Sequence, residues 1–230
     1  MQRDFVTMNV NKETIAQLAE KSFESVFRTT TEAPGFVHLV FKKEEFTPFQ
    51  FRALMIALKK EISKHIVSTS QQKLSNHWLV RFDQQVDTPF HVDNAAAHSI
   101  LMLGYEPSEV ESELQLADYH AYAQKTFEKA TTYFHKFTPI FKDDEEKLIP
   151  FITKIKMNTK EQYSIVMMNN SSPTLEATTL GVFHKAVMLT KDAKKSRIVN
   201  SMVLNIVPEE SLTDDTEKEN LFLHHTLVHT

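Results

Sequence analysis

Apolar residues recur at helical spacing near the start of the chain. In the segment 11–27 (NKETIAQLAEKSFESVF) they share one face, and Asn11 stands in the position of an N-cap. The run 35–41 (GFVHLVF) that follows is short, apolar and rich in residues that favour strands. We therefore expect a helix followed by a short strand.

A second helical stretch, 47–66, has a sharper start. Thr47 and Gln50 have the spacing of a capping box, and Pro48 stands at the first helical position, where an N–H is not needed. Apolar residues then repeat on one face at Phe51, Leu54, Leu58 and Ile62. The first 70 residues are therefore predicted to be mainly helical.

Beyond residue 70 the pattern becomes one of short strands. A helical stripe of aromatic and alanine residues at 117–137 interrupts them. The strand-like runs lie at 77–82, 99–105, 151–157, 163–169, 180–189 and 196–207. Helices placed mostly before the strands predict an α+β fold whose sheet closes into a barrel or a sandwich.

Length and composition fit a single domain. A chain of 230 residues with 41% hydrophobic content can fill one full-size core. We expect helical support at 1–70, the sheet core at 71–206 with its inserted helix near 117–137, and a polar linker and tail at 207–230. The acidic run PEESLTDDTEKEN marks that linker.

Charge and cysteine content exclude several classes of protein. The net charge is −4 and the cations form no basic stripe, which argues against a nucleic-acid partner. Without cysteine, disulfides and thiolate ligands are excluded, so nitrogen and oxygen atoms would have to hold any metal. No apolar run is long enough for a membrane span, and the start MQRDFVTMNV lacks the apolar region of a signal peptide. We expect a cytoplasmic protein without a membrane partner, and the oligomeric state is left open.

The segment FHVDNAAAH at 90–98 contains a candidate metal site. If it is extended, His91 and Asp93 point to the same side and aim an imidazole and a carboxylate at one point. The spacing alone is a weak signal, so a third ligand must come from elsewhere. His98 is near, but its expected position is the entrance of the next strand.

The better third ligand is His184, a histidine within the apolar strand LGVFHKAVML. The alternative role for His184 is a core histidine bonded to a backbone carbonyl. The turn TKDAKK follows, and we expect Arg197 to return on an adjacent antiparallel strand, side by side with His184. A buried arginine there would need an anion, unless it reaches solvent from the strand end.

This order of residues resembles the signature of the Fe(II)- and 2-oxoglutarate-dependent dioxygenases: His91-x-Asp93, the distal His184 and then Arg197. The resemblance covers roughly residues 75–206, and the stretch 90–123 also looks like a bacterial group within this superfamily. It implies a double-stranded β-helix, or jelly-roll, barrel with helices packed on it.

The resemblance also implies a chemistry. His91, Asp93 and His184 would hold Fe(II) and leave positions for 2-oxoglutarate and dioxygen. The guanidinium of Arg197 would grip the far carboxylate of 2-oxoglutarate. Members of the superfamily release succinate and carbon dioxide and form an Fe(IV)-oxo species that takes hydrogen from a C–H bond. We expect hydroxylation of a small-molecule or amino-acid-like substrate.

One departure from the family pattern concerns the cosubstrate site. Many members carry a serine two residues after the arginine, where this chain has Val199. On the same face the next hydroxyl is that of Ser201, which we take as the candidate cosubstrate ligand. Tyr105 and Asn169 are alternative donors for the missing hydrogen bond.

Three further groups have less specific patterns. Trp78 and Phe82 are expected to pack in the core, with Arg81 on the opposite face as a candidate for gripping an acidic substrate. Three C-terminal histidines could chelate a metal, but a mobile or docked tail is the favoured interpretation: His224, His225 and His229.

Two alternatives to the oxygenase remain open. The first is a cupin-like hydrolase or other metalloenzyme that uses the same histidines and aspartate around zinc or manganese, with Arg197 gripping substrate. The second is a non-catalytic barrel that binds ligands and whose histidines are structural. Dependence on metal and on 2-oxoglutarate separates the three.

Overall fold

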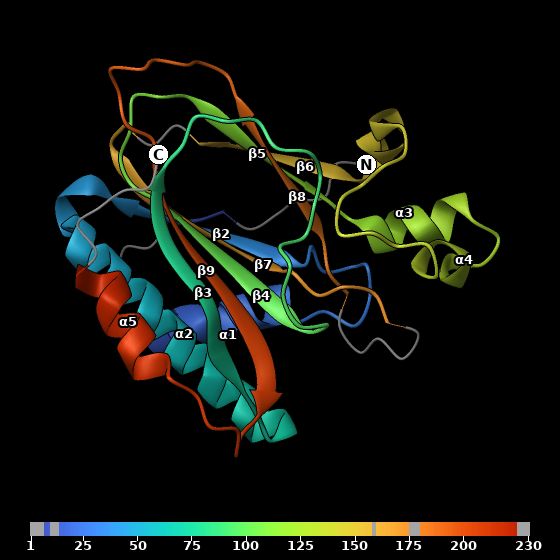
Figure 1. Ribbon diagram of the computed structural model, residues 1–230, viewed down its shortest axis with the longest axis horizontal. Coiled ribbons are helices and arrows are strands. Elements are labelled where there is room, and N and C mark those ends of the chain that lie inside the picture. Colours follow the sequence, from blue (N-terminus) through green and yellow to red (C-terminus); the bar gives the residue numbers. More distant parts are fainter. Residues whose placement is uncertain (1–6, 10–13, 158–159, 175–179, 225–230) are drawn as a thin grey trace.

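Two mainly antiparallel sheets form the centre of the molecule (Figure 1). The computed structural model describes residues 7–9, 14–157, 160–174 and 180–224. The larger sheet has six strands in the order β1 (Thr7–Asn9), β2 (Phe36–Lys42), β7 (Gln162–Asn169), β4 (Ser99–Tyr105), β9 (Ile198–Pro208) and β3 (Gln72–Asp83). The smaller has three, in the order β6 (Ile152–Met157), β5 (Ser112–Ala117) and β8 (Phe183–Met188). The pair β1 and β2 is parallel, and the other pairs are antiparallel.

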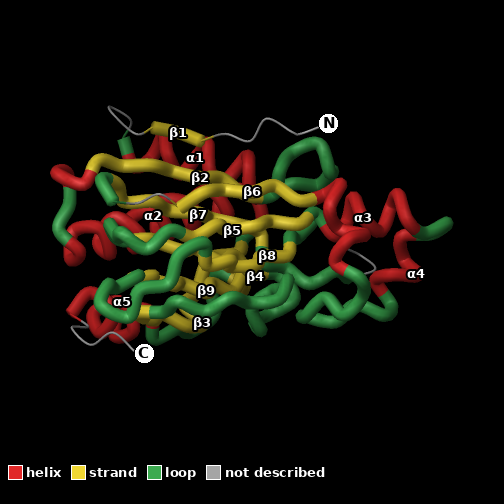
Figure 2. The backbone as a smooth tube through the Cα atoms, turned by 90° about the horizontal axis from the view of Figure 1, so that it is seen from above, coloured by secondary structure: helices red, strands yellow, loops and turns green. Residues whose placement is uncertain are grey.

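Three helices cover the outer face of the larger sheet (Figure 1): α1 (Ile15–Val26), α2 (Pro48–Ser70) and α5 (Asp215–His224). Two shorter helices, α3 (Tyr119–Thr126) and α4 (Ala130–Phe134), lie together at one end of the molecule (Figure 2). Short 3-10 turns occupy Lys43–Glu45 and Glu145–Phe151. Helices therefore support the sheets on one face and at one end, before and after the strands in sequence. No helix of the described part is both long and apolar enough to cross a bilayer.

The central strands of the larger sheet are buried on both faces. In β9, Met202 and Leu204 pack against the helices, whereas Val199 and Val203 face the smaller sheet. The same alternation, which follows from the two-residue period of a strand, divides the side chains of β4 and β7. Side chains of both sheets fill the layer between them. The odd-numbered residues of β9 thus lie on the inner face of the larger sheet, which is the face turned towards the smaller sheet.

The second helix follows the prediction closely, and the first does not. Thr47 caps α2, and its side chain and that of Gln50 form the expected capping box. Helix α1 begins at Ile15, and its N-cap is Thr14 in a second capping box with Gln17, so the prediction of Asn11 as N-cap is wrong. Asn11 itself lies outside the described residues. In a capping box the hydroxyl of the N-cap residue and the side chain three residues later each accept a hydrogen bond from a backbone N–H. This explains why the helix begins after Thr14 and not after Asn11.

The helix predicted through 117–137 is two helices with a break between them. Phe127 ends α3 in an extended conformation, and α4 begins at Ala130. The rings of Tyr122 and Tyr133 are 5.3 Å apart. In one straight helix the two residues would be separated by roughly 16 Å along the axis. Packing of both rings into one aromatic cluster therefore requires the chain to turn.

Two further elements differ from the prediction. Strand β5 was not predicted, although Leu114 and Leu116 alternate with Glu113 and Gln115 as an amphipathic strand does. Residues predicted as a polar linker include the helix α5, whose acidic residues Asp215 and Glu219 pair with the buried Lys59. Both segments are too polar to be identified from apolar content alone.

Candidate metal centre

The three predicted metal ligands come from two parts of the chain. His184 lies in β8, where it pairs with Leu116 of β5 and therefore faces the space between the sheets. His91 extends this sheet as an isolated bridge to His184, and both backbone N–H groups of the pair donate to the partner's carbonyl. After His91 the chain crosses towards β4, and Asp93 lies on this crossing, where Asn170 at the end of β7 contacts its backbone. Backbone pairing thus sets the relative positions of the ligands.

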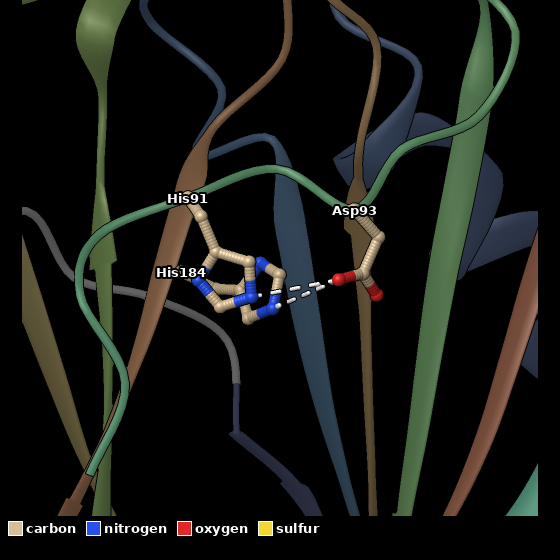
Figure 3. A group of neighbouring side chains, drawn as sticks. All are labelled: His91, Asp93 and His184. Carbon is tan, nitrogen blue, oxygen red and sulfur yellow. Dashed lines mark ion pairs between the residues drawn. The ribbon is translucent and has the colours of Figure 1, made fainter. Parts of the chain in front are cut away.

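The side chains of His91, Asp93 and His184 converge (Figure 3). One ligand atom from each lies within 4.8 Å of the others. Oδ1 of Asp93 is 3.5 Å from Nε2 of His91 and 3.9 Å from Nε2 of His184. The two imidazole rings lie 4.0 Å apart between centroids. Two imidazole nitrogens and one carboxylate oxygen on one side of a common point form the donor set of a two-histidine, one-carboxylate site.

The charges of the three groups also suit a cation. Burial lowers the pKa of His184 to about 3, so its ring is neutral and can offer a lone pair. Burial alone would raise the pKa of Asp93, but hydrogen bonding to His91 lowers it, and the carboxyl is therefore ionised. The pKa of His91 is raised, because its hydrogen bonds to Asp93 and to a backbone carbonyl outweigh the effect of burial. A divalent cation would take the place of a proton on His91 beside the Asp93 carboxylate.

The hydrogen bonds of the histidines test whether these residues fit a metal. Nδ1 of His91 lies 2.8 Å from the carbonyl of Pro89, which fixes that nitrogen as the donor and leaves Nε2 free to bind. Nδ1 of the buried His184 has no hydrogen-bond partner in the described part of the chain. A core histidine bonded to a carbonyl, the alternative role for His184, is thus not what the structure shows. The donor set fits a divalent metal.

Arg197 does not lie beside His184, so the predicted hairpin is wrong. It immediately precedes β9 of the larger sheet, whereas His184 belongs to the smaller one. Nε of Arg197 donates to Oγ of Ser112 at 3.0 Å, and Ser112 pairs with Met188 at the far end of β8. The guanidinium therefore contacts the smaller sheet roughly 13 Å along the strand from the level of His184. The connection between β8 and β9 crosses from one sheet to the other.

Arg197 is a buried cation without a carboxylate. Arg197 is 5% exposed, and no carboxylate of the described residues lies within 4.0 Å of its guanidinium group. Nη1 donates to the carbonyl of Gln84 at 3.0 Å, and the guanidinium carbon lies 5.3 Å from the centre of the Tyr105 ring. Other buried cations differ: Arg28, Arg52 and Lys59 each face an acidic side chain. A buried guanidinium group that has no carboxylate beside it is suited to binding an anionic ligand.

The side chains that were predicted to hydrogen-bond the cosubstrate lie in different parts of the structure. Ser201 is buried on the inner face of β9, four residues along from Arg197, and its role stays a prediction. Of the alternatives, Tyr105 contacts Arg197 through its ring. Asn169 instead donates to the carbonyl of Val26. Burial raises the pKa of Tyr105, and the charge of Arg197 and hydrogen bonding to it partly offset this rise. Ser112 supplies a further hydroxyl to Arg197, which we did not predict because β5 was not recognised as a strand.

Several other predicted residues lie away from this centre. Arg81 points to the helix side and forms a two-point pair with Glu106, with distances of 2.9 and 3.0 Å. Trp78 was expected in the core but is 58% exposed, whereas Phe82 packs partly buried against the inner core. His98 is not a member of the cluster. His224 ends α5 beside Phe49, and His225 and His229 lie outside the described residues.

Comparisons with known proteins identify structural neighbours only. No family model and no curated protein matches the sequence. A proposed alpha-ketoglutarate-dependent taurine dioxygenase from Burkholderia xenovorans is 10% identical, with 96% of this chain and 97% of that chain covered and a TM-score of 0.49. A taurine dioxygenase from the same organism is 9% identical, with 90% and 89% covered and a TM-score of 0.47. AAD-2 in complex with Mn(II) and N-oxalylglycine is 10% identical, with 92% and 97% covered and a TM-score of 0.43.

Two of these neighbours are described as dioxygenases. Each is at most 10% identical to this chain and has a TM-score below 0.5. The functional argument below therefore rests on the residues of the site.

Proposed function

We propose that the protein is an Fe(II)- and 2-oxoglutarate-dependent oxygenase of the double-stranded β-helix type. The observation that carries the proposal is the buried Arg197, which has no carboxylate partner among the residues that the structure describes and faces the same inter-sheet space as His91, Asp93 and His184. A metal site alone fits many reactions. A metal site together with a buried guanidinium fits a cosubstrate that has one end on the metal and an anionic group at the other.

His91, Asp93 and His184 would hold the metal. These three residues would leave room around the Fe(II) for 2-oxoglutarate and dioxygen. Bound iron supplies the activation of dioxygen, coupled to oxidative decarboxylation of the cosubstrate to succinate, and thereby the oxidation of a substrate C–H bond. The protein itself contributes position, charge and exclusion of water.

Arg197 would bind the far carboxylate of 2-oxoglutarate. A guanidinium offers two parallel donors that match the two oxygens of a carboxylate. Ser112, Gln84 and Tyr105 hold the side chain from three directions and limit its freedom before the ligand arrives. Ser201, buried on the same face of β9, is our proposed second cosubstrate ligand. The keto acid would then lie between the metal and Arg197.

The test is an anaerobic absorbance titration with Fe(II) and then with 2-oxoglutarate. We expect a visible charge-transfer band that requires both additions. In Asp93→Ala the band should be lost, and in Arg197→Ala far more 2-oxoglutarate should be needed. His98→Ala is the matched control for a histidine of the same segment outside the cluster, and Arg197→Lys tests charge without the planar fork.

The other outcomes favour the alternatives. Iron binding without a band would favour a cupin-like metalloenzyme in which Arg197 grips substrate. If wild-type protein and Asp93→Ala retain the same background amount of iron, the metal centre is refuted. Detection of succinate formed from 2-oxoglutarate in air would complete the case for an oxygenase.

A further inference from the structure

The tryptophan Trp78 lies on the inner face of the larger sheet but is not buried. It is the single tryptophan of the chain and is 58% exposed. On β3 it pairs with Val203 of β9, which is buried between the sheets, so both side chains belong to the inner face. Strand β3 is an edge strand. Trp78 therefore stands where the space between the sheets opens at this edge.

Strand registers put Trp78 near the height of the metal ligands. Its partner Val203 pairs with Leu101, and the neighbouring Ile100 pairs with Asn169. The carbonyl of Asn169 accepts a hydrogen bond from Val182, two residues before His184. Trp78 and His184 thus lie at similar levels along the strand direction, about two residues apart. The order β6, β5, β8 runs across the molecule in the same direction as β2, β7, β4, β9, β3 (Figure 2), which brings His91 and β3 to the same side of the molecule.

A second exposed apolar side chain borders the metal ligands directly. Ile140 forms an isolated antiparallel bridge with His91, on the side away from His184, and is 48% exposed. Residues paired directly across antiparallel strands share a face, so Ile140 lies beside the imidazole of His91 on the face that carries the metal ligands. Trp78 and Ile140 therefore flank the centre from the two sheets.

The inner-face positions around the centre offer no spare cation. Close to the centre, the described inner-face residues of β3, β9 and β8 besides the ligand His184 are uncharged: Val80, Phe82, Val199, Ser201, Ala186 and Met188. Lys73, on the same face of β3, lies further along the strand, where it donates to the carbonyl of Ser211. Arg197 is occupied by the cosubstrate in the function proposed above. An anionic substrate would find no partner among these side chains.

We propose that the substrate is an uncharged, largely apolar small molecule that binds against Trp78 and Ile140 at the open side of the metal centre. This inference rests on the proposed function and adds the substrate class and two specificity-determining residues to it. A rival role for Trp78 is a wall of the open groove of about 1010 Å³ between β3 and α5, which Leu221 also lines. Leu221→Ala therefore separates the two roles.

The first experiment tests position through the emission of Trp78. Co(II), which accepts the same donors as Fe(II), quenches a nearby tryptophan by short-range energy transfer, and metal content is measured in parallel by equilibrium dialysis. We expect one bound Co(II) to quench the emission in the wild type, and neither binding nor quenching in Asp93→Ala. Stoichiometric binding without quenching would refute the position of Trp78 and leave the metal centre intact. No binding would refute both proposals.

The second experiment tests substrate class with two probes that share a chromophore. N-phenyl-1-naphthylamine is uncharged, and 1-anilinonaphthalene-8-sulfonate is its anionic counterpart. In Co(II)- and 2-oxoglutarate-loaded protein without oxygen, we expect the uncharged probe to bind at least fivefold more tightly. Its affinity should fall at least fivefold in Trp78→Ala and in Ile140→Lys, and should be unchanged in Leu221→Ala and in Leu212→Ala, a fully exposed control.

Several results would overturn the proposal. Equal or tighter binding of the sulfonate would refute an uncharged substrate. Loss of probe binding in Leu221→Ala but not in Ile140→Lys would assign the apolar site to the groove. Absence of binding by the uncharged probe, when Co(II) is bound and a parallel Fe(II)-loaded sample forms the charge-transfer band, would refute the apolar wall and leave the oxygenase function standing.

Discussion

The side-chain amide of Asn170 holds the backbone of Asp93 from both sides. Its Oδ1 accepts from the N–H of Asp93 at 2.8 Å, and its Nδ2 donates to the carbonyl of Asp93 at 3.0 Å. The same Nδ2 is 2.9 Å from Oγ of Ser99, at the start of β4. One buried amide therefore fixes the carboxylate ligand where the chain passes between the two sheets.

Asn170→Ala should weaken metal binding and also lower the stability of the fold. Loss of support around a ligand typically lowers metal affinity by about 10- to 100-fold, and the buried groups left unpaired cost about 1–3 kcal/mol of stability. Equilibrium dialysis with Fe(II) measures the first effect and urea unfolding the second. Asn205→Ala is the control, because Asn205 bonds the backbone of Ala96 on the same crossing without contacting Asp93. Equal loss of affinity in both variants would contradict a specific role for Asn170.

Ser112→Ala should raise the concentration of 2-oxoglutarate needed for half-saturation. The variant removes one hydrogen bond from Arg197, worth about 0.5–1.5 kcal/mol, which corresponds to about a threefold to tenfold change. Ser201→Ala is the comparison, since Ser201 is on the same face as Arg197 but four residues away. The charge-transfer titration measures both variants. A larger effect of Ser201→Ala would identify Ser201, rather than Ser112, as the hydroxyl that serves the cosubstrate.

Arg28→Met should destabilise the protein strongly. Arg28 pairs with both carboxylate oxygens of the buried Asp118, at 2.7 and 2.9 Å, and also donates to the carbonyl of Leu180. Breaking such a pair leaves a buried charge unpaired and costs about 3–5 kcal/mol. Denaturant unfolding measures the loss. The double variant Arg28→Met, Asp118→Asn keeps the cap that residue 118 provides to Ala121 and should recover part of it; no recovery would show that the unpaired charge is not the cause.

Lys59→Met should release α5 from the rest of the molecule. The Lys59 ammonium pairs with Asp215 and with Glu219, the latter at 2.9 Å, and only Glu219 and Phe222 of this helix are buried. We expect a loss of about 3 kcal/mol, at the low end for a buried pair because Lys60 still faces Glu219. Hydrogen exchange of the α5 amides measures the release. Lys64→Met, which removes an exposed pair with Glu61, should change stability by less than about 1 kcal/mol.

The docking of α5 should also weaken in acid. Burial alone would raise the pKa of Glu219, but hydrogen bonds from Lys60 and Lys59 lower it from the usual 4.5. A carboxyl with a lower pKa in the folded state contributes its stability above the unfolded value and loses it as the pH falls below 4.5 and through the folded value. Exchange of α5 amides measured across this range should therefore accelerate with acid. In Glu219→Gln that part of the pH dependence should be absent.

The ligand cluster could be predicted from the sequence because its signal is local. His91 and Asp93 lie two apart on an extended segment, and His184 is a polar residue inside an apolar strand. The structure brings these three together, as expected. The capping box at Thr47 is a local signal as well, and it identified the start of α2 correctly.

The placement of Arg197 could not be predicted, because nothing local distinguishes a hairpin from a crossing. Strands β8 and β9 are joined by a connection long enough to serve either arrangement, and partner choice depends on strands elsewhere in the chain. The break at Phe127 has a similar cause, since it depends on the packing of Tyr122 against Tyr133. The exposure of Trp78 follows from the edge position of β3, which only the complete sheet order reveals.

The docking of α5 by charges rather than by an apolar face has a consequence for synthesis of the chain. A helix of ten residues with so little apolar surface is not stable alone, so it must wait for Lys59 and β3 to be in place. Every residue of the proposed centre precedes Asp215 and leaves the ribosome earlier. The metal ligands are therefore synthesised before α5, which packs last against Lys59 and β3 on the outer face of the larger sheet (Figure 1).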